Sequence, residues 1–394
     1  METDRPARVD ALSGLRFWAA LGILLFHYGA AFTAGLPAWV ERVRTGGHVW
    51  VGLFYVLSGF VLAYAHPRPL DGPGRRAFFA ARFARLYPAY LLAFALYAPF
   101  ALERWWGGGA AGLAKGAVVA LACLTLTQAW LPPIARIWNP PGWSTSVVAS
   151  FYLAFPHLLR WLSPRSRAAL WRAAAAAWAA SLTFPLLYVL AAPDGPGAEL
   201  LAREPRWLEA LKFHPLARLG EFVAGVALGL LVRTGGASLG RAGGPAALAA
   251  LGAAAALLAW GGAPYAFLHN GLLVPLFAIV VVGLASDAAS LPARLLGGRL
   301  SRALGDASFA LYALQEPLWR VARTLQGDPA PAGLAFTAAF TVLAVVVAVA
   351  VSRGLERPAR RWLRRWLALP PPAPRAERAG TPAPDVIRSE PSRA

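Results

Sequence analysis

The stretch Arg16-Phe17-Trp18-Ala19-Ala20-Leu21-Gly22-Ile23-Leu24-Leu25-Phe26-His27 decides the fold of this chain. It is a hydrophobic helix with a cation near its start and an imidazole deep inside it. At about 100° per residue, the spacing from Arg16 to His27 returns both side chains to one face, roughly 16 Å apart along the axis. That is about half the hydrocarbon thickness of a bilayer, so a helix starting at the cytoplasmic surface would place His27 near the midplane. An ionisable group at that depth is costly, and we therefore predict that His27 and Arg16 are catalytic.

The composition of the whole chain predicts a membrane protein. Of 394 residues, 58% are hydrophobic and only 14% are charged, whereas charged residues make up about a quarter of a soluble domain. The formal net charge of +19 follows the rule that Lys and Arg collect in cytoplasmic loops. No basic domain stands apart from the hydrophobic runs, so nucleic acid is not an expected partner. The single cysteine, Cys123, excludes an intrachain disulfide, and no metal site is predicted.

Eleven apolar segments are candidate membrane helices, because a backbone exposed to lipid must satisfy its hydrogen bonds internally. Their ranges are 15–33, 47–65, 86–102, 115–131, 144–162, 168–192, 214–232, 245–262, 267–285, 304–322 and 332–352. The sequence thus predicts an all-α fold, a polytopic helical bundle in a lipid bilayer.

Basic loops indicate how many of these segments cross the membrane. Arg5 and Arg8 place the N-terminus in the cytoplasm, and the arginines of 68–85 place the next basic loop there too. The arginines of 160–172 lie in the cytoplasm only if either the fourth or the fifth apolar segment does not cross the membrane. About ten crossings with both termini cytoplasmic satisfy the rule best, and 144–162 is the candidate re-entrant segment.

The C-terminal region changes character after the last segment. Residues 357–367 mix arginine with tryptophan and leucine, a pattern typical of a basic amphipathic helix on the inner leaflet. From Pro370 onward the residues are mostly Pro, Ala, Arg, Glu and Ser, which predicts disorder. We therefore divide the chain into a membrane domain, 1–369, and a Pro-rich cytoplasmic tail, 370–394.

Arginines alternate with aromatic residues in 75–90, just before the third apolar segment. Arg82 and Arg85 share one helix face because they are three residues apart, and Tyr87 follows them. Such a face could bind anionic lipid. The sharper interpretation is a cradle for the phosphates of a cytosolic nucleotide-bearing donor, since guanidinium groups bind phosphate in a bidentate manner.

A second polar cluster surrounds a proline-broken turn and contains Asn139, Trp143, Ser144 and Ser146. Amide, indole and hydroxyl groups suit a sugar or another polyhydroxyl acceptor, so these four are candidate substrate-binding residues. The alternative is a tryptophan belt at the membrane interface with a serine that caps a helix.

Seven motifs follow one another along the chain. They are the Arg16–His27 helix, Phe-Tyr-Val-Leu-Ser-Gly-Phe (54–60), Arg-x-x-Arg-Leu-Tyr-Pro-Ala-Tyr (82–90), Asn-Pro-Pro-Gly-Trp-Ser-Thr-Ser (139–146), Arg-Leu-Gly-Glu-Phe-Val-Ala-Gly (218–225), Gly-Asp-Ala-Ser-Phe-Ala-Leu-Tyr (305–312) and Glu-Arg-Pro (356–358). Together, over about residues 8–366, they resemble the bacterial membrane-bound acyltransferase family 3. These are integral-membrane O-acyltransferases that modify surface polysaccharides and other glycosylated products.

The resemblance implies a reaction and a location. An acyl group, often acetyl, would pass from cytosolic acyl-CoA to a hydroxyl, usually of a sugar on a lipid-linked or extracytoplasmic acceptor. His27 matches the essential membrane histidine, Arg16 its partner arginine, and Arg82 with Arg85 the donor-side motif. The implied location is the bacterial inner membrane, and acyl-CoA is a substrate, so no cofactor is expected.

The sequence departs from the family pattern at two places. The Trp-Ser-x-Ser-Val motif is usually followed by Glu, where this chain has Val148. The pattern Tyr-x-x-His-x-Pro near the tenth segment has Gln315 in place of His. If the usual Glu orients the histidine, Glu316 could replace it as a catalytic carboxylate, and Glu221 is a second substitute.

Acyl transfer to an alcohol needs a base for the hydroxyl proton and stabilisation of a tetrahedral oxyanion. A desolvated imidazole stays neutral, so His27 is the best candidate base. It could instead carry the acyl group itself. Ser144, Ser146 and Asn139 are candidate oxyanion donors.

Two other functions fit parts of the sequence. Val148 and Gln315 motivate a catalytically impaired relative. A glycolipid transporter or flippase would show weak two-fold symmetry with broken helices in both halves, and the sequence shows no such repeat.

Overall fold

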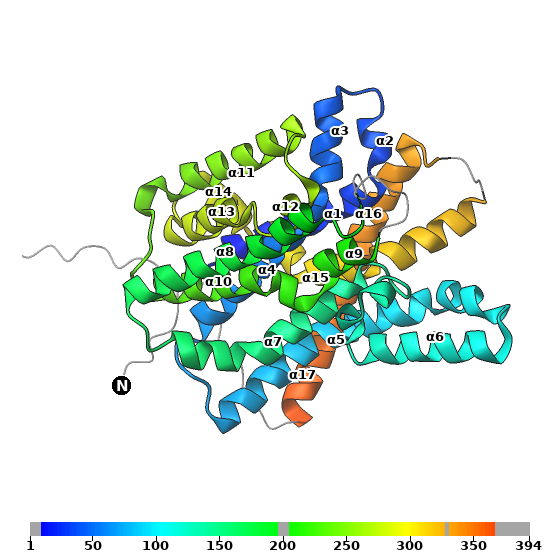
Figure 1. Ribbon diagram of the computed structural model, residues 1–394, viewed down its shortest axis with the longest axis horizontal. Helices are drawn as coiled ribbons and strands as arrows, with labels where there is room; N and C mark the ends of the chain where they lie inside the picture. The colour runs from blue at the N-terminus through cyan, green and yellow to red at the C-terminus, as the bar shows by residue number, and fades with distance from the viewer. Residues whose placement is uncertain (1–8, 196–204, 328–330, 367–394) are drawn as a thin grey trace, which may run out of the picture.

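The computed structural model describes residues 9–195, 205–327 and 331–366, which form a bundle of helices with no strand among them (Figure 1). The helices are α1 (Ala11–Tyr28), α2 (Ala30–Thr33), α3 (Ala38–Thr45), α4 (Trp50–Ala65), α5 (Gly72–Trp106), α6 (Gly109–Leu124), α7 (Gly142–Leu162), α8 (Arg167–Ala191), α9 (Arg206–Phe213), α10 (Pro215–Arg233), α11 (Gly243–Trp260), α12 (Tyr265–His269), α13 (Val274–Ser286), α14 (Leu291–Leu296), α15 (Arg299–Gln326), α16 (Leu334–Val351) and α17 (Arg357–Trp366). The predicted all-α bundle is confirmed, and each of the eleven apolar segments contains a helix, although 267–285 is broken between α12 and α13 and 115–131 leaves the helix after Leu124.

Eight helical stretches of the described chain are long and apolar enough to cross a membrane. The chain is therefore a multi-pass membrane protein. Helices α7 and α15 are not among the eight, although they contain 21 and 28 residues. Their polar side chains lower their hydropathy, and these include Ser144 on α7 and Glu316 on α15.

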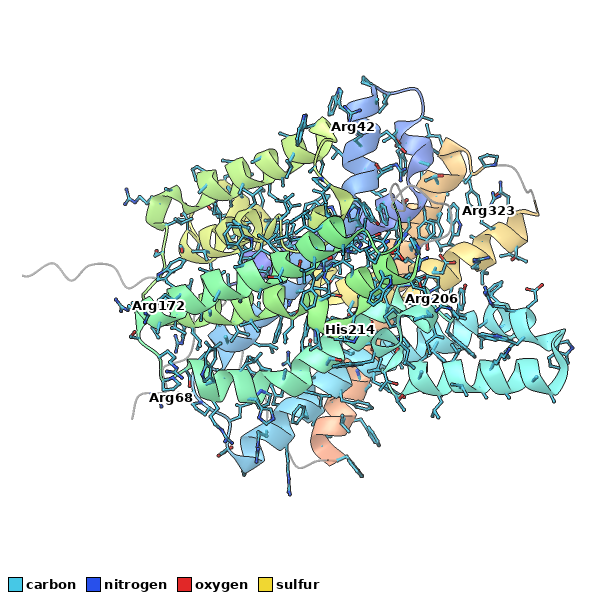
Figure 2. The ribbon with its side chains drawn as sticks, in the orientation of Figure 1. Arg42, Arg68, Arg172, Arg206, His214 and Arg323 are labelled. Carbon is cyan, nitrogen blue, oxygen red and sulfur yellow. The ribbon has the colours of Figure 1, made fainter. Side chains whose placement is uncertain are left out.

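The bundle has two polar ends. One end, which we call the inner end, holds the start of α1, where Asp10 pairs with Arg302 at 2.7 Å. The opposite end is the outer end. Figure 2 shows Arg68 and Arg172 at the inner end and Arg42 at the outer end. The names follow the predicted topology, and Arg5, Arg8 and the tail 370–394 lie outside the described residues.

Helices α6 and α7 both run antiparallel to α5. Four contacts with α5 give their order: Gly116 at Trp105, Leu124 at Tyr87, Gly142 at Tyr90 and Phe155 at Phe78. Helix α6 thus follows the outer part of α5 and α7 follows its inner part. The two segments together make one passage through the bundle, which agrees with about ten crossings.

A partly buried segment, 125–141, joins α6 to α7 and contains two short 3₁₀ turns, Gln128–Trp130 and Pro132–Ile134. Its polar groups find protein partners: Gln128 Nε2 donates to the Gly142 carbonyl at 3.1 Å, and Asn139 Nδ2 donates to the Ala313 carbonyl at 3.1 Å. Trp138 Nε1 donates to the Phe94 carbonyl at 2.9 Å. Non-helical backbone at membrane depth requires such internal partners.

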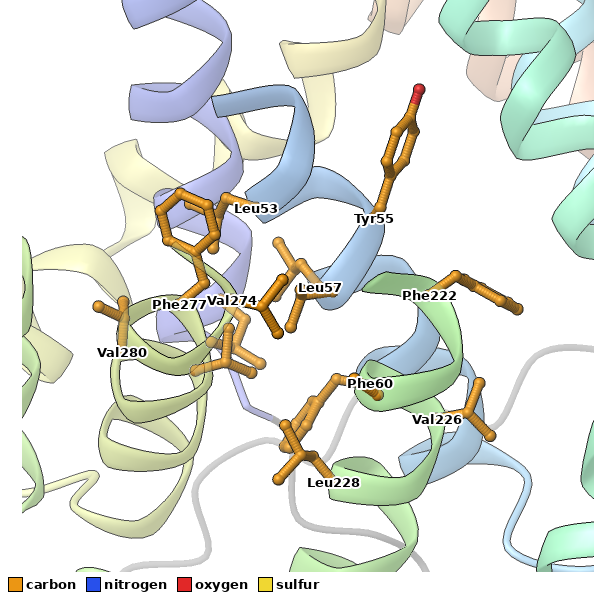
Figure 3. Close-up of a cluster of buried hydrophobic side chains, with 14 of the residues drawn as sticks. Leu53, Tyr55, Leu57, Phe60, Phe222, Val226, Leu228, Val274, Phe277 and Val280 are labelled. Atoms are coloured by element: carbon orange, nitrogen blue, oxygen red, sulfur yellow. The ribbon is translucent and has the colours of Figure 1, made fainter. Parts of the chain in front are cut away.

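Close backbone contacts between α4 and α10 form the centre of the core. A Cβ on Gly59 would lie 2.2 Å from the Phe222 carbonyl oxygen, and a Cβ on Gly225 would lie 2.1 Å from the Val56 carbonyl oxygen. Small residues let membrane helices approach in this way. Side chains of α4, α10 and α13, among them Phe60, fill the space around the contact (Figure 3).

We expect Gly59→Ala to destabilise the protein by about 1–3 kcal/mol, since overpacking a close contact forces backbone shifts. Thermal unfolding in detergent would measure the loss. Gly252→Ala on α11 is the control, because a Cβ there meets no atom within 4 Å. Equal unfolding midpoints for both variants would contradict the close α4–α10 contact.

Candidate active site

A cavity of about 300 Å³ lies between α1, α4, α5, α7 and α15. Three arginines line it, Arg16 from α1 and Arg82 and Arg85 from α5. The structure therefore brings together the three arginines that the sequence singled out from two distant motifs. The remaining wall is apolar apart from hydroxyl groups, and none of its lining residues is acidic.

The arginines have few protein partners. Arg16 donates from its Nη2 to Ser13 Oγ at 2.9 Å, and the Arg82 guanidinium lies over the rings of Phe78 and Tyr152, at 5.7 and 6.0 Å from their centroids. The Nε atoms of Arg16 and Arg82 are buried without a partner in the described chain. An unsatisfied buried donor costs about 1–3 kcal/mol. A cationic cavity with unsatisfied donors is suited to an anionic ligand.

Hydroxyl groups gather at another part of the cavity wall. Ser144 Oγ donates to Tyr312 Oη at 2.7 Å, and Tyr312 Oη donates to the Pro141 carbonyl at 3.0 Å. Tyr55 also lines the cavity, and its hydroxyl is buried without a partner among the described residues. The sequence analysis missed Tyr55, although it lies within the motif 54–60. A hydroxyl group carries one proton, so Tyr55 is the member of this group that is free to donate to a carbonyl oxygen of a ligand.

His27 and Glu316 lie together at the outer end. Helix α1 ends at Tyr28, so His27 occupies its last turn, farther from the start of the helix than the midplane position we expected. Glu316 accepts hydrogen bonds from Tyr28 Oη at 2.5 Å and from Arg320 Nε at 2.8 Å. His27 is exposed, and Glu316, Arg136 and Lys212 lie within electrostatic reach of it.

The cavity and the His27 region are separate but connected by two helices. On α1, Ala20 and Ile23 lie between Arg16 and His27 on the same face, and both are buried. On α15, Tyr312 precedes Glu316 by four residues, about one helical turn. The hydroxyl groups of the cavity therefore lie roughly one turn of α15 below the level of His27.

A family model described as an acyltransferase domain matches residues 9–353. The chain belongs to acyltransferase family 3. "Acyltransferase MdmB" of Streptomyces mycarofaciens is 32% identical over 244 residues, 59% of this chain and 59% of that protein. "Protein 2 in picA locus" of Rhizobium radiobacter is 41% identical over 102 residues, 25% of this chain and 49% of that protein. The matches thus span roughly half the length of these relatives, and no solved structure matches the chain.

The two departures from the family pattern occupy different surroundings in this chain. Val148 lines the cavity, so its substitution for Glu leaves the three arginines without an acidic neighbour in the cavity wall. Gln315 is fully buried, and its Nε2 donates to the Tyr312 carbonyl at 2.9 Å. Its Oε1 has no partner among the described residues.

Four predicted substrate-binding residues do not line this cavity. Tyr87 Oη donates to the Leu124 carbonyl at 3.0 Å, and the Trp143 ring lies 4.8 Å from the Phe213 ring. Ser146 Oγ donates to the Leu126 carbonyl at 2.6 Å, and Asn139 is the buried residue that holds Ala313. Each has a structural contact, and their roles in substrate binding remain predictions.

A buried ion pair lies within α10 and contacts α12 through His269, and the sequence analysis recognised only its acidic member. Arg218 Nη2 lies 2.9 Å from Glu221 Oε2, and its Nη1 lies 2.7 Å from His269 Nδ1. The second carboxylate oxygen of Glu221 accepts from the Gly271 amide at 3.1 Å. Both oxygens of Glu221 are therefore occupied, whereas Glu316 is the carboxylate that lies near His27.

Further ionisable side chains extend this network toward α1. The His48 ring stacks on the His269 ring at 5.0 Å, and it lies 5.8 Å from the Phe26 ring. Lys212 is buried with its ammonium 5.1 Å from the centre of the Tyr265 ring. In the part of the chain that the structure describes, no group of three His, Cys, Asp or Glu side chains is placed to hold a metal ion.

We expect Arg218→Met to destabilise the protein by about 3–5 kcal/mol, because it leaves the Glu221 carboxylate buried without a countercharge. The thermal midpoint in detergent would show the loss. The double variant Arg218→Met/Glu221→Leu should recover much of it, since it removes both charges. A double variant as unstable as the single one would show that Glu221 does not act through its pairing with Arg218.

Proposed function

We propose that this chain is an O-acyltransferase that takes an acyl group, acetyl in the simplest case, from cytosolic acyl-CoA. The acceptor is a hydroxyl of a sugar in a surface polysaccharide, a glycolipid or a glycosylated metabolite. The observation that best supports a phosphorylated donor is the cavity, where Arg16, Arg82 and Arg85 meet without an acidic neighbour in the wall. The motif order and the match to the acyltransferase family model support acyl transfer.

The size of the cavity favours a donor with a narrow arm. About 300 Å³ lies at the lower limit of ligand pockets and is too small for the whole of CoA. The pantetheine arm would enter the cavity, and the nucleotide would stay outside, near the arginines. The acyl end would then pass the hydroxyl groups of Ser144, Tyr312 and Tyr55 and extend toward His27, roughly one turn of α15 beyond them.

His27 acts in this proposal as the general base. It takes the proton of the acceptor hydroxyl while the hydroxyl oxygen attacks the thioester carbonyl, and the tetrahedral oxyanion accepts hydrogen bonds from hydroxyl groups. Collapse of the intermediate breaks the carbon–sulfur bond, and the CoA thiolate takes the proton back from His27. Glu316 supports the imidazolium that forms between the two steps.

The location that fits this reaction is a bacterial inner membrane with both termini in the cytoplasm. The inner end of the bundle would then face the cytosolic pool of acyl-CoA. The outer end, with His27 and Glu316, would face the acceptor, which can be lipid-linked.

We expect His27→Ala to lower the rate of label transfer from radiolabelled acetyl-CoA to a sugar-lipid pool by about 10²–10⁴-fold, the usual contribution of a general base. Binding of CoA should be unchanged, because the arginines lie on the inner side of the bundle. His157→Ala is the control, since His157 is exposed on α7. Label transfer at the wild-type rate by a well-folded His27→Ala protein would contradict the role of His27 as the base.

The same assay without acceptor distinguishes a base from an acyl carrier. A base leaves the protein unlabelled under these conditions, which is our expected result. Rapid gel filtration at neutral pH to remove lipid and CoA, followed by scintillation counting of the protein, would check this. Label that remains on wild-type protein and is absent from His27→Ala would instead identify an acyl-histidine intermediate.

A catalytically impaired relative is the second candidate, because Val148 and Gln315 replace usual family residues and Val148 faces the arginines. This candidate predicts no CoA release from wild-type protein with any sugar-lipid pool. It also predicts that Val148→Glu restores turnover. Turnover by wild-type protein would exclude it.

A further inference from the structure

Helix α17 lies beside the cavity arginines, although it is distant from them in sequence. It packs against α5, the helix that carries Arg82 and Arg85. Arg360 of α17 lies within electrostatic reach of both of these arginines. The amphipathic helix predicted over 357–367 is confirmed as α17, and its position adds a cation to the donor side of the bundle.

Three contacts hold α17 in this position. A single π turn, Ser352–Glu356, connects it to α16. Arg357 Nη2 lies 3.0 Å from Asp306 Oδ2 on α15, and Glu356 is buried beneath the start of the helix. The Glu-Arg-Pro motif thus orients α17 against the bundle, which sets the position of Arg360 one turn further on.

Arg360 is only partly neutralised. Its Nη2 lies 3.7 Å from Glu356 Oε2, a distance too long for a good hydrogen bond, and the side chain is 27% exposed. Glu356 also lies within electrostatic reach of Arg85. Asp306, which pairs with Arg357, is the second carboxylate within reach of Arg360. Two carboxylates therefore face Arg82, Arg85, Arg357 and Arg360, and this group keeps a net positive charge. Like charges this close favour an anion with more than one negative charge.

We propose that Arg360 binds the ribose 3′-phosphate of CoA outside the cavity, while Arg16, Arg82 and Arg85 hold the rest of the donor. This deepens the proposed function and rests on it. The cavity admits only the arm of the donor, so the 3′,5′-phosphorylated nucleotide lies at its mouth. The 3′-phosphate is the most distant anionic group from the thioester, and Arg360 is the member of the arginine group that lies on the amphipathic surface helix.

The test compares two ligands that differ only in this phosphate. Binding of CoA and of 3′-dephospho-CoA to the full-length protein in neutral-lipid nanodiscs would be measured by calorimetry. We expect wild-type protein to bind CoA about tenfold more tightly, as a charge-assisted hydrogen bond allows. In Arg360→Gln this ratio should fall close to one, through weaker CoA binding alone. Arg360→Lys should keep part of the ratio, since it keeps the charge and loses the planar fork.

Arg361→Gln is the matched control, because Arg361 is exposed on the same helix and its loss removes the same charge. It should keep the wild-type ratio. An unchanged ratio in Arg360→Gln, or a wild-type protein that binds both ligands equally well, would overturn the assignment of Arg360. A wild-type protein that binds neither ligand would overturn the proposed acyl-CoA donor itself.

Anionic lipid could supply the same phosphate chemistry. Repeating the measurement in nanodiscs that contain phosphatidylglycerol separates the two sources. A ratio that depends on Arg360 in both lipids supports the 3′-phosphate. An effect of Arg360→Gln that appears only with phosphatidylglycerol, and equally for both ligands, would assign Arg360 to the lipid and overturn the proposal.

Discussion

The close packing of the start of α1 against α14 and α15 sets the relative position of the cavity and of His27. A Cβ on Gly305 of α15 would lie 2.0 Å from the Ser13 carbonyl oxygen, and a Cβ on Gly14 would lie 2.2 Å from the Leu296 carbonyl oxygen at the end of α14. Only glycine at these positions lets the backbone of α1 come so close to α14 and α15. Because α1 and α15 run parallel from this point, the register places Tyr28 beside Glu316. One packing constraint thus positions parts of both the cavity and the His27 region.

The electrostatics of the cavity follow from its low-polarity surroundings. Guanidinium groups resist deprotonation, so the cavity arginines remain charged where charge is costly. Most buried charges in proteins are offset by a partner, as Arg218 is by Glu221. No acidic side chain lines the cavity wall beside its three arginines, and Val148 stands there at the position of the usual Glu. The positive charge of this cavity therefore favours the binding of an anionic ligand.

Much of the fold could be predicted because membrane helices are recognised in a sequence by their long apolar segments. The sequence predicted the eleven helical segments and the helix that became α17, and it brought Arg16, Arg82 and Arg85 into one hypothesis. It could not show that α6 and α7 divide one passage between them, since this depends on tertiary contacts of the segment 125–141. Nor could it show that Tyr87 and Ser146 donate hydrogen bonds to neighbouring elements and that the Trp143 ring packs on another ring. Helical spacing does not reveal which element faces a side chain. Arg218 was in view as part of a motif, yet its pairing with His269 joins residues far apart in sequence.

The packed residues between Arg16 and His27 have a consequence for the energetics of the proposed reaction. Ala20 and Ile23 are buried, so this face of α1 is packed against its neighbours between the cavity and His27. Only the acyl group would pass from the inner to the outer side of the bundle, and cleavage of the thioester bond would supply the driving force. In the proposed reaction, the protein would move an acyl group across a bilayer as a transporter moves its substrate. It would need no ion gradient, and neither the acyl donor nor the acceptor would cross.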